Sequence, residues 1–267
     1  MKRREFLKPL LGAALVSATS SGAAAMARPT TAPDAGKAPE PAQNRPEIAM
    51  LLYPGLTFLD LMGPFAVLGR MTNVHLVWKN TDLLTMDMGL KVQPTCSFAD
   101  CPAKLDAVFV GGGPGQLAVM QDSVCIDFLA DRGARATYVT SVCSGSLILG
   151  AAGLLRGYRA TSHWAYRDLL PLFGATPVNQ RVVVDRNRIT GGGVTAGIDF
   201  GLTLLSLLAG EGVARTIQLA IEYDPKPPFE AGTPEKAGPG PTQAVRAQIA
   251  GRIDAIREFA NGLHMQA

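Results

Sequence analysis

The hydrophobic positions of the chain fall into short continuous runs, separated by Gly, Pro and polar residues. Several of these runs are apolar throughout, which is typical of parallel strands that are buried on both faces. They alternate with longer stretches in which apolar residues recur at helical spacing. The pattern predicts strands at 47–53, 74–78, 105–110 and 138–142, hairpin-like pairs at 83–94 and 181–190, and helices at 57–71, 116–130, 147–155, 161–173, 195–209, 211–223 and 244–262.

This alternation predicts an α/β fold, a flavodoxin-like parallel sheet sandwiched by helices. The 267 residues are enough for one such domain with a large core. We place the domain at 47–230. A Pro-rich stretch at 28–46 precedes it as a linker that is expected to be disordered, and 231–267 holds a Pro/Gly-rich segment followed by a C-terminal helix.

The first 27 residues have the composition of an export signal. Arg3 and Arg4 are followed by Phe-Leu-Lys, then by a moderately apolar stretch at 10–25, and Ala25-Met26-Ala27 fits a cleavage site. We expect a twin-arginine signal peptide, a periplasmic mature protein, and no stable membrane insertion after cleavage.

The charge of the chain is concentrated in this signal. The net charge is +3, and the basic excess within residues 1–27 accounts for all of it. The remaining chain is neutral, which argues against a nucleic-acid partner and favours a small-molecule substrate.

The strand at 138–142 ends at Cys143, and Ser144 and Gly145 lead at once into a helix. A strand that turns directly into a helix through small residues is a nucleophile elbow, here with Cys in the nucleophile position. The helix N-terminus favours a thiolate at this place. The alternative is a buried Cys that packs as a small hydrophobic residue.

Two other loops follow strands and are expected at the same edge of the sheet. One carries Asp60, a candidate acid/base residue. The other is the glycine turn at 111–113, and the amides of Gly112, Gly113 and Ser144 are candidates for an oxyanion hole. The alternative for Asp60 is a capping box with Thr57 three residues earlier.

The remaining candidates are weaker. His163 either faces the thiol or makes a structural hydrogen bond. His75 is expected in the core, His264 lies in the tail, and Asp199 is explained by its place in the first turns of a helix. Whether Cys96, Cys101 and Cys125 form a disulfide is left open, and no zinc site is expected at Cys96 and Cys101. Ser146 lies three residues after the elbow position and is not expected to be the nucleophile.

Taken together, the motifs resemble the ThiJ/PfpI superfamily, which has a class I glutamine-amidotransferase-like fold. The resemblance rests on LYPGLTFLDLMGP at 52–64, on VCSGS at 142–146, and on the GLL, RAT and HW groups between 153 and 164. GGGVTAGID at 191–199 and IQLAIEYD at 217–224 are similar to the isonitrile hydratase branch.

This resemblance implies a homodimer without metal or cofactor, in which Cys143 is the nucleophile and Asp60 the acid/base residue. It also implies a hydratase that converts isonitriles to N-substituted formamides. Hydratases of this branch usually have Thr after the Cys, whereas Ser144 keeps the hydroxyl and lacks the methyl group. The alternatives are a non-catalytic thiol redox sensor or stress-protective protein, and another hydrolase or glyoxalase-like activity.

Overall fold

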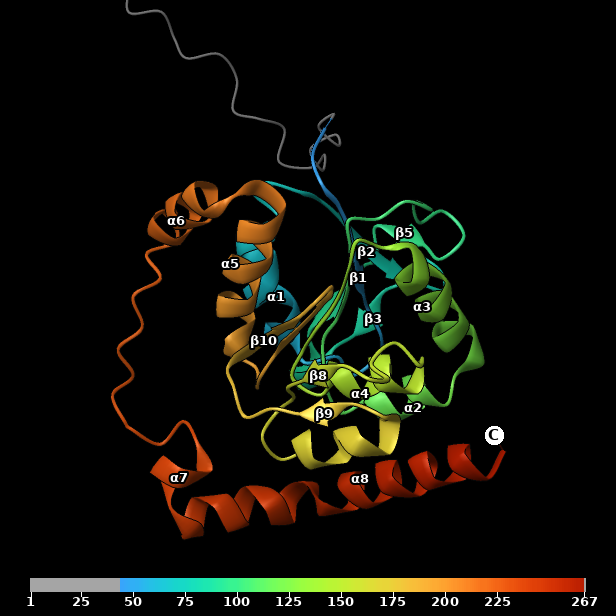
Figure 1. The fold of residues 1–267 in the computed structure, drawn as a ribbon, viewed down its shortest axis with the longest axis vertical. Helices are drawn as coiled ribbons and strands as arrows, with labels where there is room; N and C mark the ends of the chain where they lie inside the picture. Colours follow the sequence, from blue (N-terminus) through green and yellow to red (C-terminus); the bar gives the residue numbers. More distant parts are fainter. Residues whose placement is uncertain (1–43, 267) are drawn as a thin grey trace, which may run out of the picture. The chain divides into compact units, whose positions relative to one another are not determined.

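A computed structural model describes residues 44–266, with side chains as far as Leu263, and these residues belong to one compact unit (Figure 1). The signal peptide, most of the linker and the side chain of His264 lie outside the described residues.

A seven-stranded sheet forms the centre of the unit, in the order β10-β11-β7-β6-β1-β2-β5. All neighbouring strands are parallel except β10, which pairs antiparallel with β11. The strands are β1 (Glu47–Leu51), β2 (Asn73–Trp78), β5 (Cys96–Ser97), β6 (Ala107–Val110), β7 (Tyr138–Val142), β10 (Val182–Asp185) and β11 (Arg188–Gly191). The predicted fold class, a largely parallel sheet with helices on both faces, is confirmed.

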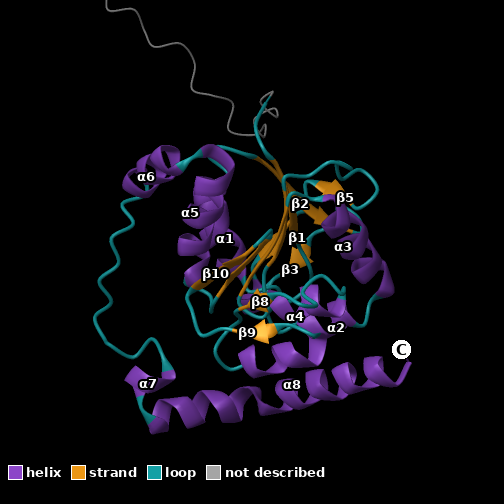
Figure 2. Cartoon of the chain, in the orientation of Figure 1, coloured by secondary structure: helices purple, strands orange, loops and turns teal. Residues whose placement is uncertain are grey.

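The central strands are continuous apolar runs because both of their faces are covered. Ile48–Leu51 in β1 and all residues of β6 are buried. Helices α1 (Phe58–Leu68) and α5 (Ala196–Ala209) lie together on one face, while α2 (Gln116–Met120), α3 (Ser123–Arg135) and α4 (Gly145–Ala151) lie on the other (Figure 2). The three strands that carry candidate residues therefore end at one edge of a rigid layer.

The structure differs from the predicted elements mainly in the helices. The stretch at 116–130 is two helices, because the first ends at Met120 and Asp122 caps the start of the second, where its side chain accepts a hydrogen bond from the Cys125 amide at 3.4 Å. The helix expected from Thr161 is a 3-10 helix, η2, which begins only at Arg167. The structure also contains the following: β8 (Arg159–Ala160), β9 (Thr176–Pro177), α6 (Glu211–Ala220), α7 (Pro234–Ala237) and a long α8 (Pro239–Gln266).

The predicted small hairpin at 83–94 is present as β3 (Leu84–Thr85) and β4 (Lys91–Val92), with a short 3-10 turn, η1 (Asp87–Gly89), between them. Its tip contacts the start of α1. The Phe58 amide donates to Asp87 Oδ1 at 2.8 Å, and the Asp87 amide donates to the Leu56 carbonyl at 2.9 Å. Asp87 therefore caps α1 from outside the helix, while Thr57 makes no side-chain cap.

In the part of the chain that the structure describes, no helix combines the length and the apolar character that crossing a membrane requires.

Candidate active site

Cys143 occupies the turn between β7 and α4, as the elbow prediction requires. Its φ of 59° lies in the left-handed region, which costs a residue with a Cβ about 1–2 kcal/mol. Backbone bonds hold the strained turn: the Cys143 amide donates to the Gly192 carbonyl at 2.7 Å. The Cys143 carbonyl accepts from Ser146 Oγ at 3.3 Å and from Ser162 Oγ at 3.0 Å. Ser146 thus supports the turn.

Two glycines let the neighbouring loops touch the elbow. A Cβ on Gly145 would lie 2.1 Å from the Val110 carbonyl oxygen, and one on Gly112 would lie 2.4 Å from Ser144 Oγ. Both contacts are far shorter than carbon and oxygen atoms tolerate. The absence of a side chain at these positions is therefore what brings the glycine turn after β6 against the Cys143 turn.

Asp60, on the first turn of α1, is fully buried and faces the same place. Its Oδ2 accepts from the Gly112 amide at 2.7 Å, and its Oδ1 is buried without a nitrogen or oxygen donor among the described residues. The carboxyl group also interacts with the Cys143 thiol. Neither hydrogen bond of a capping box with Thr57 is formed, so Asp60 is placed at the site rather than at the cap.

The thiol and the carboxyl group share a buried environment that opposes negative charge on either. Burial raises the pKa of Asp60 from its ordinary 3.8 to about 7. Burial, followed by the charge of Asp60, raises the pKa of Cys143 well above its ordinary value. The expected thiolate-favouring effect of the helix N-terminus is therefore outweighed in the resting site. Only with Asp60 protonated does the thiolate lose its repelling neighbour.

The amides near the sulfur are arranged differently from the expected oxyanion hole. The backbone N–H groups of Ser144 and Val194 hydrogen-bond to the Cys143 sulfur and act to lower its pKa. The Gly112 amide is bound to Asp60, and the Gly113 amide donates to Ser144 Oγ at 3.4 Å. Sequence reasoning missed Val194, because every residue carries an amide and only the loop after β11 brings this one to the thiol.

His163 lies at the edge of the site. Its Nδ1 accepts from the Ala165 amide at 3.3 Å, and its ring packs between Trp164 and Tyr166. Burial lowers its pKa, which favours the neutral imidazole. The structure thus shows the hydrogen-bonded role for this ring, beside the loop that carries Val194: a Cβ on Gly193 would lie 2.8 Å from its Cδ2 atom.

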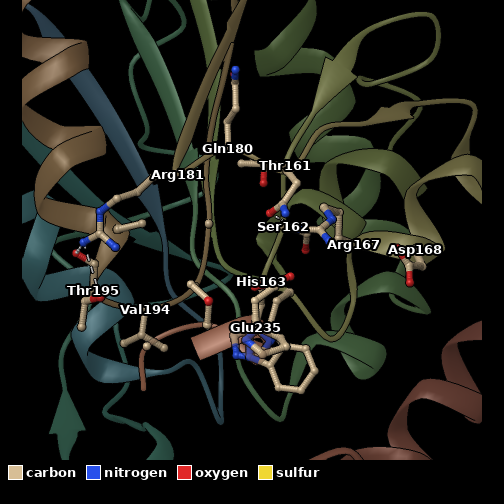
Figure 3. Close-up of a pocket in the computed structure, with 18 of the residues that line it drawn as sticks. Thr161, Ser162, His163, Arg167, Asp168, Gln180, Arg181, Val194, Thr195 and Glu235 are labelled. Carbon is tan, nitrogen blue, oxygen red and sulfur yellow. Dashed lines mark hydrogen bonds between the residues drawn. The ribbon is translucent and has the colours of Figure 1, made fainter. Parts of the chain in front are cut away.

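A cavity of about 540 Å³ opens beside this loop (Figure 3). Its walls come from the segment before η2, from the loop between β11 and α5, and from the C-terminal part of the chain, which contributes Glu235 and Arg246. His163 and Val194 line the cavity, and the Val194 amide also contacts the Cys143 sulfur, although neither Cys143 nor Asp60 is among the lining residues. Arg181 points to the rim, where it bonds Asp199 and the Thr195 carbonyl.

The other predicted polar residues have structural partners. Asp199 accepts from Arg181 Nε at 2.7 Å and from the Tyr223 hydroxyl at 2.8 Å. His75 was expected in the core but is only half-buried, and its Nε2 lies 2.5 Å from Glu47 Oε2 at the start of β1. Among the described side chains, no group of three or more His, Cys, Asp or Glu residues is placed to hold a metal ion.

Comparison with known proteins agrees with this geometry. The model of the DJ-1/PfpI family matches residues 46–207, which is more than half of the chain and includes Asp60, the glycine turn and the elbow. The chain belongs to the DJ-1/PfpI family.

Relatives within the DJ-1/PfpI family differ in how closely they match. The chain is 53% identical to an isonitrile hydratase of Pseudomonas putida over 193 residues, which cover 72% of this chain and 84% of the relative. A solved ThiJ/PfpI family protein from Pseudomonas syringae is 48% identical, with a TM-score of 0.79, covering 88% and 97% of the two chains. A DJ-1 superfamily protein from Salmonella typhimurium is 26% identical, with a TM-score of 0.61, covering 67% and 98%.

Proposed function

We propose that this protein is a cysteine-dependent hydratase that converts an isonitrile and water into an N-substituted formamide. The observation that carries the proposal is the contact between the Cys143 thiol and a buried Asp60 whose pKa is raised to about 7, in a chain 53% identical to an isonitrile hydratase. A carboxyl group with such a pKa both donates and accepts a proton near neutral pH.

The reaction begins when the Cys143 proton moves to Asp60 and the sulfur attacks the terminal isonitrile carbon. The Ser144 and Val194 amides stabilise the sulfur while it carries charge. The new S–C bond leaves an electron pair on that carbon, and Asp60 returns the proton to it, giving a thioimidate. This step needs a proton donor in direct reach, and the buried Asp60 carboxyl group beside the sulfur is that donor.

Water then adds to the thioimidate carbon. Asp60 accepts one proton of this water and passes a proton to the substrate nitrogen. Collapse of the adduct expels the sulfur and leaves the formamide, so that one water is consumed and the thiol–carboxyl pair is restored. The cavity beside Val194 offers room for the substituent on nitrogen. Its mixed polar and aromatic lining, including Trp164 and Arg246, suits a small organic group.

The test is turnover by the purified mature protein. With a simple alkyl isonitrile we expect the matching N-alkyl formamide, identified by mass spectrometry, with oxygen derived from labelled water. Hydrolysis of esters or conversion of methylglyoxal without formamide production would support the hydrolase or glyoxalase-like alternative instead. A protein without any turnover whose Cys143 oxidises reversibly would support the redox sensor.

We also propose that the chain is exported through the twin-arginine route. Arg3 and Arg4 are the part of the signal that this route reads. Replacing both with Lys should keep the protein in the cytoplasm of a host that has the pathway, as measured by fractionation, while a variant with Lys2→Arg alone should be exported normally. Periplasmic protein from the double variant would contradict the assignment.

A further inference from the structure

Two more cysteines meet at the sheet edge that lies apart from the elbow. Cys96 is in β5, where it pairs with Val77 of β2, and Cys101 follows a tight turn. Figure 1 shows β5 and α4 well separated, so this pair is a site distinct from Cys143.

The turn between the two cysteines brings their sulfur atoms together. The Cys101 amide donates to the Ser97 carbonyl at 3.0 Å, and Ser97 Oγ donates to Asp100 Oδ2 at 2.5 Å. Within this closed turn, the two sulfurs interact, and the Cys101 thiol also donates to the Pro102 carbonyl at 3.8 Å. Both residues are free thiols in the structure, so the sulfurs are adjacent without being bonded.

The surroundings give the two thiols opposite characters. The hydrogen bond from Cys96, with the guanidinium of Arg132, lowers the pKa of Cys101 to about 7. The same hydrogen bond and burial raise the pKa of Cys96. Arg132 is fixed by its Nη2 donor to the Cys101 carbonyl at 3.3 Å and by the Phe128 ring beneath it.

An aromatic stack also holds the turn between Cys96 and Cys101 in place. Phe98 lies within the turn and stacks on Phe128 of α3, with ring centroids 4.0 Å apart and the planes 8° from parallel. Trp78 of β2 meets Phe98 edge-on at 5.8 Å. The thiol pair therefore sits on a rigid support, with Cys96 half-buried and Cys101 only 4% exposed.

We propose that Cys96 and Cys101 form a second thiol site, which reduces hydroperoxides by closing into an internal disulfide. Cys101 is the attacking residue and Cys96 the resolving residue. A nucleophilic thiolate beside a thiol that remains protonated is the arrangement that such a two-step oxidation requires.

The steps balance with hydrogen peroxide as the oxidant. The Cys101 thiolate attacks one peroxide oxygen, the O–O bond breaks, and the departing hydroxide takes a proton to become water. The product is a sulfenic acid on Cys101. The Cys96 sulfur then attacks the Cys101 sulfur, the S–O bond breaks, and the hydroxide leaves as water with the Cys96 proton. Two thiols are oxidised to one disulfide while the peroxide is reduced to two waters.

The experiment treats the reduced, purified protein with hydrogen peroxide, alkylates the remaining thiols, and maps the peptides by mass spectrometry. We expect a Cys96–Cys101 disulfide, reversed by dithiothreitol, while Cys125 remains a thiol because burial raises its pKa to about 12. In Cys96→Ser, dimedone should trap a sulfenic acid on Cys101. In Cys101→Ser, burial still raises the pKa of Cys96, so labelling of Cys96 should be slower than labelling of Cys101 in Cys96→Ser.

Cys125→Ser is the matched control and should form the disulfide like the wild type. Protein in which Cys143 is oxidised while Cys96 and Cys101 both remain thiols would overturn the proposal, as would equal dimedone labelling in the two Ser variants. The peptide map of the wild-type protein tests the proposal even if one of the variants fails to fold. Isonitrile turnover is not a readout here, so this result and the hydratase result stand separately.

Discussion

Replacing Asp60 with Asn is expected to lower isonitrile turnover at least ~10²-fold, which is the usual loss when a general acid–base group is removed. Asn keeps the size of Asp and can still accept the hydrogen bond that the Gly112 amide donates at 2.7 Å. It cannot carry a proton from the Cys143 sulfur to the substrate carbon. The measurement is formamide production from an alkyl isonitrile at saturating substrate.

Cys143→Ala should abolish turnover, and the double variant should be no slower than Cys143→Ala alone, because the two residues act as one unit. Near-full turnover by a folded Asp60→Asn enzyme would contradict the mechanism and leave Asp60 as a structural acceptor for the glycine turn. Turnover by Cys143→Ala would remove the nucleophile from the proposal.

The pH dependence of the free energy of unfolding serves as the folding control for Asp60→Asn. Because burial raises the pKa of Asp60 from 3.8 to about 7, the folded protein retains a proton that the unfolded chain releases. The stability from this proton is fully present below pH 3.8 and is lost as the pH rises through 7. Asn does not ionise, so unfolding of Asp60→Asn in urea should change less between pH 6 and pH 8 than that of the wild type.

Gly145→Ala is expected to destabilise the protein by about 3 kcal/mol or more, at the upper end of overpacking effects. The added Cβ would lie 2.1 Å from the Val110 carbonyl oxygen and 2.8 Å from the Gly111 backbone. These atoms belong to β6 and the turn that follows it, so neither can move without breaking the sheet or displacing the glycine turn.

Gly251→Ala in α8 is the matched control, since nothing lies within 4 Å of its added Cβ. This change should leave stability unaltered or raise it by up to about 1 kcal/mol, because Ala favours the helix. Chemical denaturation of both variants is the measurement. A Gly145→Ala protein as stable as Gly251→Ala would show that the elbow and the glycine turn are not in the close contact described here.

The sequence predicted the parts of the fold that depend on local pattern. Strand β7 begins and ends at the expected residues, because its aromatic and β-branched residues favour a strand and the small residues after Cys143 end it. The two-residue strands β5 and β9 have no such run and exist only through pairing with distant partners. The break between α2 and α3 did have a local signature, the Asp122-Ser123 pair, which is typical of a helix start.

The site divides in the same way. The position of Cys143 could be predicted because a strand, small residues and a helix follow one another there without a break. The positive φ of Cys143 agrees with the predicted elbow geometry. The proton balance between Cys143 and Asp60 does not follow from sequence, because it depends on how deeply both groups are buried. The sequence suggested a thiolate, whereas burial raises the pKa of both Cys143 and Asp60 and so favours the thiol over the thiolate in the resting site. Whether Gly112, Gly113 and His163 take part in turnover stays a prediction.

The hairpin formed by β3 and β4 has a consequence for engineering this protein. Asp87 reaches the Phe58 amide at 2.8 Å, and the Gly55 amide reaches the Thr85 carbonyl at 2.9 Å, so the hairpin sets where α1 starts. One inserted residue shifts an extended chain by roughly 3.3–3.6 Å, which is more than either bond tolerates. A tag or inserted domain at 84–92 would displace the helix that carries Asp60, whereas the turn at Gly210, with nothing within 4 Å of a Cβ there, is open to insertion.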